Sequence, residues 1–536
     1  MHNQRSAVRV EPHVRGTHSR PVASKQSDPK GSCMSSARRT PRTRTATRLG
    51  APLAAAVLLT GGLSAWALTG ATAQAATAAP SVEVQDDFNG DGYADLAVGA
   101  PGATVSGKKN AGHVTVVYGS KSGLNTAKKK IVSRSTSGVP GAATANQRFG
   151  STFSKGDLDG DGYGDLVIAG GTAGSVVLWG SASGLTGGTN IAGYGAAPQT
   201  GDFDGDGKTD LALFTAQSVG GDDPSGAPAA LWKGPVSRAG KPAAVLDLLA
   251  KSEWWGYGAD DASCDTAAGG GCEDGPDSIT GPVLSGAAGD VNGDGKDDLV
   301  QWRYTGDGTW GTRLLLSSPS GFVRGWAPGD GDGGTTPGIG VGDVNGDGYD
   351  DVVVGSDDWD HQVRVAYGAA SGLDENRVRT LDQDAPGIHG VEEEGDRFGS
   401  AVSVADVTGD GYADIALGIS GEDFSGLTDA GSFALVPGRA SGVLGSGTVV
   451  MHQNTEGVPG VAEKGDKFGA AAALLDVDGD GHRDLAVSST AENSSNGAVW
   501  VLRGTSTGLT AKSALAFGAK DLSAPYTDAL FGSALR

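Results

Sequence analysis

The stretch Asp87-Phe88-Asn89-Gly90-Asp91-Gly92-Tyr93-Ala94-Asp95-Leu96 decides the fold of this chain, because its pattern returns six more times. The shared pattern is Asp-x-(Asp/Asn/Thr)-Gly-Asp-Gly-x-x-Asp. The seven copies, numbered loops 1 to 7, start at Asp87, Asp157, Asp202, Asp290, Asp343, Asp406 and Asp476. Their starts lie 45 to 88 residues apart, so each unit has a fixed core and variable connections. Such self-similarity predicts a repeat architecture.

The spacing of oxygen donors in each loop predicts a calcium ion. Side-chain oxygens at positions 1, 3, 5 and 9, with the backbone carbonyl of position 7, can converge on one hard cation. Calcium accepts six to eight oxygens in flexible geometry, whereas magnesium requires a tighter octahedron and retains water. The glycine at position 6 allows the sharp turn that brings positions 5 and 7 to the same ion. We therefore expect about seven structural calcium ions.

The predicted ligands are the residues at positions 1, 3, 5, 7 and 9 of every loop. They are Asp87, Asn89, Asp91, Tyr93, Asp95, Asp157, Asp159, Asp161, Tyr163, Asp165, Asp202, Asp204, Asp206, Lys208, Asp210, Asp290, Asn292, Asp294, Lys296, Asp298, Asp343, Asn345, Asp347, Tyr349, Asp351, Asp406, Thr408, Asp410, Tyr412, Asp414, Asp476, Asp478, Asp480, His482 and Asp484. At position 7 only the carbonyl is expected to contact the ion, so the ring of His482 has no assigned role.

The residues that follow each loop exclude an EF-hand, which needs glutamate at position 12 and flanking helices. Here position 9 leads into Leu96-Ala97-Val98-Gly99 or Leu485-Ala486-Val487, short apolar runs typical of strands. Each ion is therefore expected between two strands. The alternative is a set of solvated Asp-Gly turns without metal, which would leave seven clusters of mutually repelling aspartates.

Composition favours an all-β protein with an acidic surface. Glycine supplies 91 of 536 residues, which suits short strands joined by tight turns. The chain holds 41 Lys/Arg and 63 Asp/Glu, of which residues 1–75 contain eleven and two. Residues 76–536 therefore carry a net charge of −31. Such a surface repels nucleic acid and anionic lipid, so we expect neither as a partner.

Residues 1–75 have the layout of a secretory leader. Basic residues from Arg38 to Arg48 precede an apolar run, and Ala73-Gln74-Ala75 then gives a small-x-small cleavage site. Met34 would begin a leader of ordinary length. The alternative is a membrane anchor, which the run is long enough to form. We expect cleavage after Ala75 and a secreted, extracellular chain of residues 76–536 without membrane insertion.

An insertion is expected around residues 216–285, between loops 3 and 4. It contains Cys264 and Cys272, and in an oxidising compartment we expect these to form a disulfide; a reduced pair is the alternative. It also contains Trp254, Trp255 and Tyr257, which can either anchor a ligand or pack the insertion onto the fold.

Further pieces recur in register with the loops. Phe149-Gly150, Phe398-Gly399 and Phe468-Gly469 precede three of them, and Gly99-Ala100-Pro101 follows the first. With these pieces, residues 85–536 resemble the FG-GAP repeats of the integrin alpha-subunit N-terminal region. The resemblance implies a seven-bladed β-propeller with four antiparallel strands per blade and calcium loops in some blades. The Phe-Gly pair is missing before loops 3, 4 and 5, so the middle blades depart from the pattern.

The two ends of the repeat region predict how the ring closes. Loop 1 has no Phe-Gly strand before it, whereas Phe531-Gly532-Ser533-Ala534 repeats the Phe398-Gly399-Ser400-Ala401 pattern after the last unit. We therefore expect the C-terminal strand to complete the first blade, which would hide two strand edges.

The sequence offers no convincing catalytic constellation, and we expect no enzyme. Gly504-Thr505-Ser506-Thr507-Gly508 fits the pattern of a hydrolase nucleophile elbow, but it lies in a unit-ending turn without that fold's context. Histidine pairs of the metalloprotease type are absent. Glu392, Glu393 and Glu394 are interpreted as a solvated loop.

Ligand binding or adhesion is the favoured function, because a propeller presents loops from all blades on one face. We expect an extracellular protein or glycan as the ligand and a monomeric chain. Trp302, Trp310 and Trp326 are further candidate contacts. The alternatives are a carbohydrate-binding or structural cell-surface protein and a propeller-based enzyme, such as a polysaccharide lyase or phospholipase.

Overall fold

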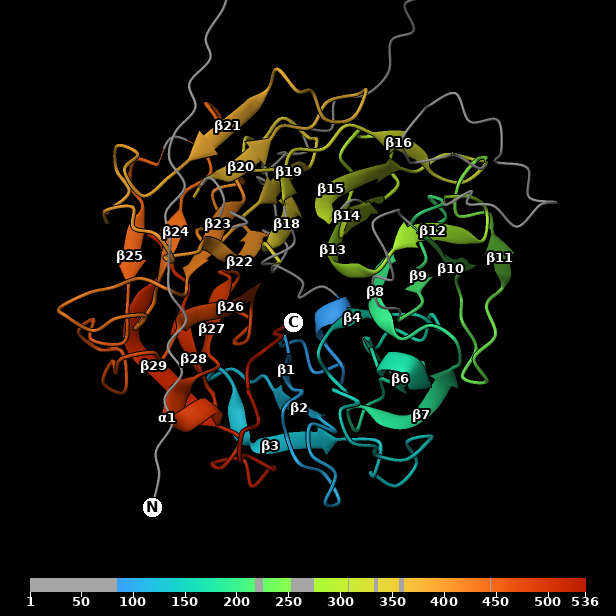
Figure 1. The fold of residues 1–536 in the computed structure, drawn as a ribbon, viewed down its shortest axis with the longest axis horizontal. Coiled ribbons are helices and arrows are strands. Elements are labelled where there is room, and N and C mark those ends of the chain that lie inside the picture. Colours follow the sequence, from blue (N-terminus) through green and yellow to red (C-terminus); the bar gives the residue numbers. More distant parts are fainter. Residues whose placement is uncertain are drawn as a thin grey trace, which may run out of the picture. The chain divides into compact units, whose positions relative to one another are not determined.

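The computed structural model describes residues 84–216, 225–251, 274–306, 308–331, 336–355, 361–443 and 445–536. In this part of the chain, seven antiparallel sheets follow one another in chain order around a central axis (Figure 1). The prediction of an all-β, seven-bladed propeller with four-stranded blades is confirmed. The predicted leader, Cys264, Cys272, Trp254, Trp255 and Tyr257 lie outside the described residues.

The strands are numbered along the chain, and each blade runs from the axis outward. Blade 1 has β1 (Leu96–Ala100), β2 (His113–Tyr118) and β3 (Asn125–Val132); blade 2 has β4 (Phe153–Gly156), β5 (Asp165–Ile168), β6 (Ser175–Trp179) and β7 (Thr186–Ile191); blade 3 has β8 (Ala196–Gly201), β9 (Asp210–Phe214), β10 (Ser225–Lys233), β11 (Ala244–Leu246) and the extra β12 (Ser278–Gly281).

The remaining blades follow the same order. Blade 4 has β13 (Val283–Gly289), β14 (Asp298–Gly306), β15 (Thr309–Leu316), β16 (Val323–Gly325) and the extra β17 (Asp330–Gly331); blade 5 has β18 (Ile339–Gly342), β19 (Asp351–Val354), β20 (Val363–Ala366) and β21 (Val378–Leu381); blade 6 has β22 (Phe398–Ala405), β23 (Asp414–Ile419), β24 (Ser432–Val436) and β25 (Val449–Met451); blade 7 has β26 (Phe468–Leu475), β27 (Asp484–Ser489), β28 (Ala498–Arg503) and β29 (Thr510–Gly518). Three short helical turns are η1 (Val84–Asp86), η2 (Gly171–Ala173) and α1 (Glu492–Ser495).

The middle strands are buried along their whole length because neighbouring blades cover both of their faces. Every residue of β2, β23 and β24 is buried, whereas the outer strand β3 carries exposed lysines. Seven hydrophobic clusters are each shared by two adjacent blades, and the last of them joins blade 7 to blade 1. The core is therefore a ring of interfaces, which explains why repeated units are stable only together.

The Phe-Gly and Gly-Ala-Pro pieces meet between neighbouring blades. A Cβ on Gly99 would lie 2.2 Å from the carbonyl oxygen of Gly150, and one on Gly418 would lie 1.9 Å from that of Gly469. Only glycine allows the backbones of adjacent blades to approach this closely. The buried Phe149 and Phe468 rings beside these contacts fill the cores between blades.

The C-terminal segment completes blade 1, as predicted. Val98 of β1 pairs antiparallel with Leu535, and the Ala97 and Gly99 amides donate to the carbonyls of Arg536 and Ala534 at 2.9 Å each. Phe531 is fully buried and its amide donates to the Asn496 carbonyl. Figure 1 places the C-terminus at the centre of the ring.

The interval predicted as an insertion, 216–285, contains blade strands. β10 and β11 are the third and fourth strands of blade 3, and β12 pairs with β10 before the chain enters blade 4. Among the described residues, no helix has the length and apolar character needed to cross a membrane.

Candidate metal centres

The seven loops share one local fold, set by the aspartate at position 1. In loop 1, Asp87 Oδ1 accepts from the amides of Gly90 and Asp91 at 2.6 and 3.2 Å, and Oδ2 accepts from Gly92 at 2.7 Å. The bonds from positions 5 and 6 recur in all seven loops. Gly92 at position 6 has a φ of +84°, which confirms the predicted sharp turn.

The aspartate at position 9 joins each loop to the next turn of its blade. In loop 6, Asp414 Oδ2 accepts from the Val407 amide at 3.1 Å and Oδ1 accepts from the Gly438 amide at 3.1 Å. The same two bonds occur in every loop. Sequence reasoning assigned this aspartate only to the ion, so its structural role was missed.

Burial makes these position 9 carboxylates hard to ionise without a cation. It raises the pKa of Asp95 to about 8 and that of Asp165 to about 7, against an ordinary value near 3.8. Hydrogen bonds from the backbone lower the pKa but do not cancel the cost of burial. An adjacent divalent cation would stabilise the ionised form of these carboxylates and so stabilise the folded loop.

The side chain at position 7 packs against the neighbouring loop. A Cβ on Gly90 would lie 2.5 Å from the Tyr163 ring, and the His482 ring lies beside Gly409 of loop 6. The position 7 side chain covers the position 4 glycine of the preceding blade in six of the seven loops, and only Gly160 of loop 2 has no such neighbour. This contact corrects the expectation that the ring of His482 has no role.

Backbone hydrogen bonds also link the loops into a chain around the propeller. In five loops the amide at position 8 donates to the position 1 carbonyl of the preceding loop; these pairs are Ala94 to Asp476, Gly164 to Asp87, Asp297 to Asp202, Asp350 to Asp290 and Ala413 to Asp343. The first of these pairs joins loop 1 to loop 7 and so crosses the point of ring closure.

The donor set of the loops fits a hard cation. In loops 2, 3 and 7 three carboxylates each offer an oxygen within 4.8 Å of the others; these groups are Asp157/Asp159/Asp165, Asp202/Asp204/Asp206 and Asp476/Asp478/Asp484. A second observation concerns position 3, where Asp159 Oδ1, Asp204 Oδ1, Asp478 Oδ1 and Thr408 Oγ1 are buried without a hydrogen-bond partner. A buried, unsatisfied oxygen is costly, and a calcium ion would satisfy it.

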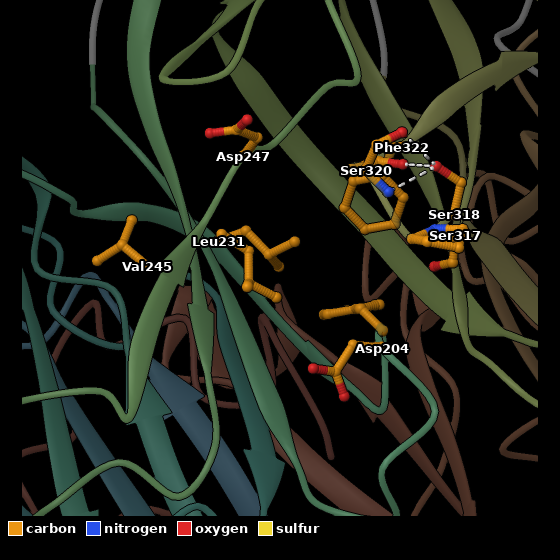
Figure 2. A pocket seen from close by; sticks show the side chains of 12 residues that line it. Asp204, Leu231, Val245, Asp247, Ser317, Ser318, Ser320 and Phe322 are labelled. Atoms are coloured by element: carbon orange, nitrogen blue, oxygen red, sulfur yellow. Dashed lines mark hydrogen bonds between the residues drawn. The ribbon is translucent and has the colours of Figure 1, made fainter.

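A cavity of about 360 Å³ lies beside loop 3, between blades 3 and 4. In Figure 2, Leu231 and Val245 come from the outer strands of blade 3, and the turn Ser317–Phe322 comes from blade 4. Asp204 of loop 3 reaches its rim, and Phe203 meets Phe322 edge-on at 5.5 Å. The lining of the cavity therefore combines aromatic rings with hydroxyl and carboxylate groups.

Other candidates from the sequence lie in ordinary structural positions. Ser506 lies in the turn between β28 and β29, where the Thr505 hydroxyl donates to the Gly508 carbonyl at 2.6 Å. Trp302 is 1% exposed, so it packs the blade, whereas Trp326 is 38% exposed and remains accessible. Of the three glutamates predicted to form a solvated loop, Glu393 and Glu394 are exposed and Glu392 is half-buried.

Comparison with known families and proteins agrees with this geometry. The FG-GAP repeat model matches residues 80–117, 336–372, 398–436 and 468–502, and the FG-GAP-like repeat model matches residues 157–213. The chain carries FG-GAP repeats. These matches include loops 1, 2, 3, 5, 6 and 7, whereas loop 4 lies outside them, and the predicted resemblance to FG-GAP repeats is confirmed.

The FG-GAP region is similar to parts of larger proteins. Phosphatidylinositol-glycan-specific phospholipase D of Rattus norvegicus is 33% identical over 155 residues, which is 27% of this chain and 17% of that protein. Integrin alpha pat-2 of Caenorhabditis briggsae is 30% identical over 224 residues, which is 38% of this chain and 17% of that protein. The chain thus matches about a sixth of the length of these relatives.

Proposed function

We propose that this protein is a secreted, calcium-stabilised FG-GAP propeller that binds an extracellular protein or glycan ligand and catalyses no reaction. The observation that carries the proposal is the set of seven oxygen-rich loops that share the same hydrogen bonds to the carboxylates of positions 1 and 9, with five of the seven neighbouring pairs linked through the backbone. The residues at positions 1, 3, 5 and 9 would hold the ions. Bound calcium would supply positive charge to the position 9 carboxylates, whose pKa burial raises.

Calcium binding is tested by two measurements on the protein recovered from culture medium. Calorimetric unfolding with calcium and with excess EDTA should show a large calcium-dependent rise in melting temperature. Mass spectrometry under native conditions should count about seven ions. A protein that binds no calcium and melts at one temperature in both buffers would refute the proposal. N-terminal sequencing of the same material tests cleavage after Ala75.

Ligand binding is supported by the similarity to an integrin alpha chain and by the cavity beside loop 3. Arrays of glycans and of extracellular matrix proteins, probed with calcium and with EDTA, separate the two ligand classes. Calcium-dependent binding to one class would identify it. We expect a single chain in solution, which sedimentation measures directly.

An enzymatic function is the second candidate, because part of a phospholipase D of glycosylphosphatidylinositols is similar to this chain. Incubation with glycosylphosphatidylinositol-anchored protein in calcium buffer tests it. Release of the anchor by the purified protein, lost on removal of calcium, would favour the enzyme over the binding module.

A further inference from the structure

Loops 2, 3 and 7 differ from the other four in the charge at position 3. They carry Asp159, Asp204 and Asp478, whereas loops 1, 4, 5 and 6 carry the neutral Asn89, Asn292, Asn345 and Thr408. Each of the three aspartates pairs with a lysine or arginine through Oδ2, while its Oδ1 stays buried without a partner.

Lys233 makes this contact in loop 3. It is the last residue of β10, and its Nζ contacts Asp204 Oδ2 and lies 2.8 Å from Asp206 Oδ2. The ammonium group thus bridges the carboxylates of positions 3 and 5. The same two carboxylates are predicted to share the calcium ion, so the lysine already supplies part of the charge that the ion would bring.

Arg238 makes the equivalent contact in loop 2, although it belongs to the turn of blade 3. Its Nε lies 2.5 Å from Asp159 Oδ2, and its Nη2 lies 2.6 Å from Asp161 Oδ2. Positions 3 and 5 are bridged again, here by a residue of the neighbouring blade. The guanidinium also lies 5.8 Å from the centre of the Trp179 ring, and this cation–π contact helps to position the Arg238 side chain.

Arg503 makes the contact in loop 7. It ends β28, and its Nη1 contacts Asp478 Oδ2, a carboxylate whose side chain is 3% exposed. Lys233 and Arg503 occupy the same place in their blades, immediately before the residue whose amide binds the position 9 aspartate. In blades 1 and 5, whose loops have a neutral position 3, this place holds Tyr118 and Tyr367. Blade 2 has Trp179 at this place although its loop carries Asp159, and Arg238 of blade 3 supplies the cation instead. Each position 3 aspartate is therefore paired with a basic residue, in two loops from this place and in one loop from the neighbouring blade.

We propose that Lys233, Arg238 and Arg503 are resident counter-ions that divide the seven loops into two calcium-binding classes. Loops 1, 4, 5 and 6 bind calcium tightly and depend on it for their shape. Loops 2, 3 and 7 bind it more weakly, because a fixed cation competes for the oxygens of position 3, and they keep their shape without it. This inference rests on the proposed calcium binding and goes beyond it.

The charges give each side chain two effects of opposite sign. Removing a resident counter-ion takes one positive charge away from four carboxylates, so the loop repels itself more strongly when calcium is absent. In loop 3, Lys208 still lies 3.1 Å from Asp206 Oδ2, but it does not reach position 3. The same removal strengthens the attraction of that loop for a divalent cation, since affinity of oxygen sites follows the number of ligand charges. A residue that merely packed the loop would not strengthen calcium binding when removed.

The test is a calcium titration of the whole secreted protein and its Lys233→Met variant, with bound ions counted by native mass spectrometry. We expect the natural protein to load four ions first and three at higher free calcium. Lys233→Met should load five ions in the first step, with affinity at the changed loop roughly tenfold higher. Its melting temperature in EDTA should fall by about 1–2 °C. Arg503→Met tests loop 7 in the same way.

Two controls separate charge balance from lost packing. Arg377→Met removes an arginine that, among the carboxylates of loop 5, pairs only with position 5, at 3.2 Å from Asp347 Oδ2, and the variant should leave the first step at four ions. Arg377 also donates to the Gly368 carbonyl at 2.8 Å, so this variant loses comparable packing without a change at position 3. The double variant Asp204→Asn/Lys233→Met recreates the neutral position 3 of loop 5, and should regain the EDTA melting temperature of the natural protein.

The outcomes are distinct. Equal loading of all seven loops in the natural protein, or weaker calcium binding by Lys233→Met, would overturn the two classes. Failure of the double variant to recover stability in EDTA would overturn the charge-balance explanation. If neither the natural protein nor any variant binds calcium, the proposed function fails, and the EDTA melting temperatures still report whether the three residues act as counter-ions.

Discussion

The seven Asp-Gly loops and the connections between blades are held together in different ways. In all seven loops the carboxylates at positions 1 and 9 accept the same backbone hydrogen bonds, whatever the rest of the blade contains. The connections, which run from the last strand of one blade to the first strand of the next, are held by different polar contacts in different blades. Under the proposed calcium binding, a loop must satisfy one cation geometry, whereas a connection needs only some partner for its buried polar groups.

Three connections make this divergence visible because they have equal length. Arg134, Gln383 and Gln453 each lie 15 residues before a buried phenylalanine of a Phe-Gly pair. Gln383 donates to Glu422 at 2.6 Å and Gln453 donates to Glu492 at 2.8 Å. Arg134 instead donates to the carbonyls of Pro140 and Gly174 and to Asn190.

The connection that enters blade 4 is held by a buried ion pair. Arg303 donates to both oxygens of Asp274 at 2.9 Å, and Arg324 contacts the same carboxylate. Burial raises the pKa of Asp274, but the two guanidinium groups outweigh it and leave the pKa below its ordinary value. We therefore expect substitutions in the loops to change the effect of calcium on the melting temperature. Substitutions in the connections should leave that effect unchanged.

The largest effect is expected where the last connection closes the ring. Deleting residues 527–536 would expose the edge of β1 and remove the buried Phe531 and Leu535 from the core between blades 7 and 1. We expect a loss of about 5 kcal/mol or more, seen as a collapse of the cooperative unfolding transition in calorimetry. A variant that melts like the full chain would contradict the role of this segment in closure.

The next effect comes from Asp274→Ala. This change leaves the Arg303 guanidinium, which is 1% exposed, without its carboxylate partner. The free energy of unfolding, measured with denaturant, should fall by about 3–5 kcal/mol. Because the change lies in a connection, the calcium-dependent gain in melting temperature should stay as in the natural protein. A reduced calcium response would break the distinction between loops and connections.

A loop variant should behave in the opposite way. Asp414→Asn weakens the bonds to Val407 and Gly438 and removes a predicted calcium ligand, so we expect a loss of about 2–3 kcal/mol in calcium buffer. The gain from adding calcium should shrink, and native mass spectrometry should find one ion fewer. Glu394→Gln, an exposed change in the same blade, serves as the control and should alter neither value.

The pH dependence sharpens the comparison further. The folded pKa of the position 9 carboxylates lies at about 6 to 8, above the unfolded value near 3.8. Between these values the folded state holds protons that the unfolded state has released, so raising the pH destabilises the folded state. In EDTA the melting temperature should therefore fall by several degrees from pH 5 to pH 8. Calcium, by favouring the ionised form, should flatten this fall.

The smallest effects come from the equivalent connections. Arg134→Met leaves buried carbonyls without donors and should cost about 2 kcal/mol, whereas Gln453→Met should cost about 1 kcal/mol. Chemical denaturation with and without calcium measures both. A larger loss for Gln453→Met would show that the hydrogen bond of Gln453 to Glu492 stabilises the fold more than the contacts of Arg134 do.

The sequence by itself determined the number of units, the strands beside each loop and the closure of the ring. These follow from local rules, since Asp-Gly spacing fixes a loop and apolar runs fix strands. Only the tertiary structure decided which residues meet between blades. The placing of Arg238 on loop 2, the Tyr163 ring over Gly90 and the two arginines on Asp274 join residues of different blades or far apart in sequence. Such contacts depend on how one blade is rotated against the next, which no local pattern encodes.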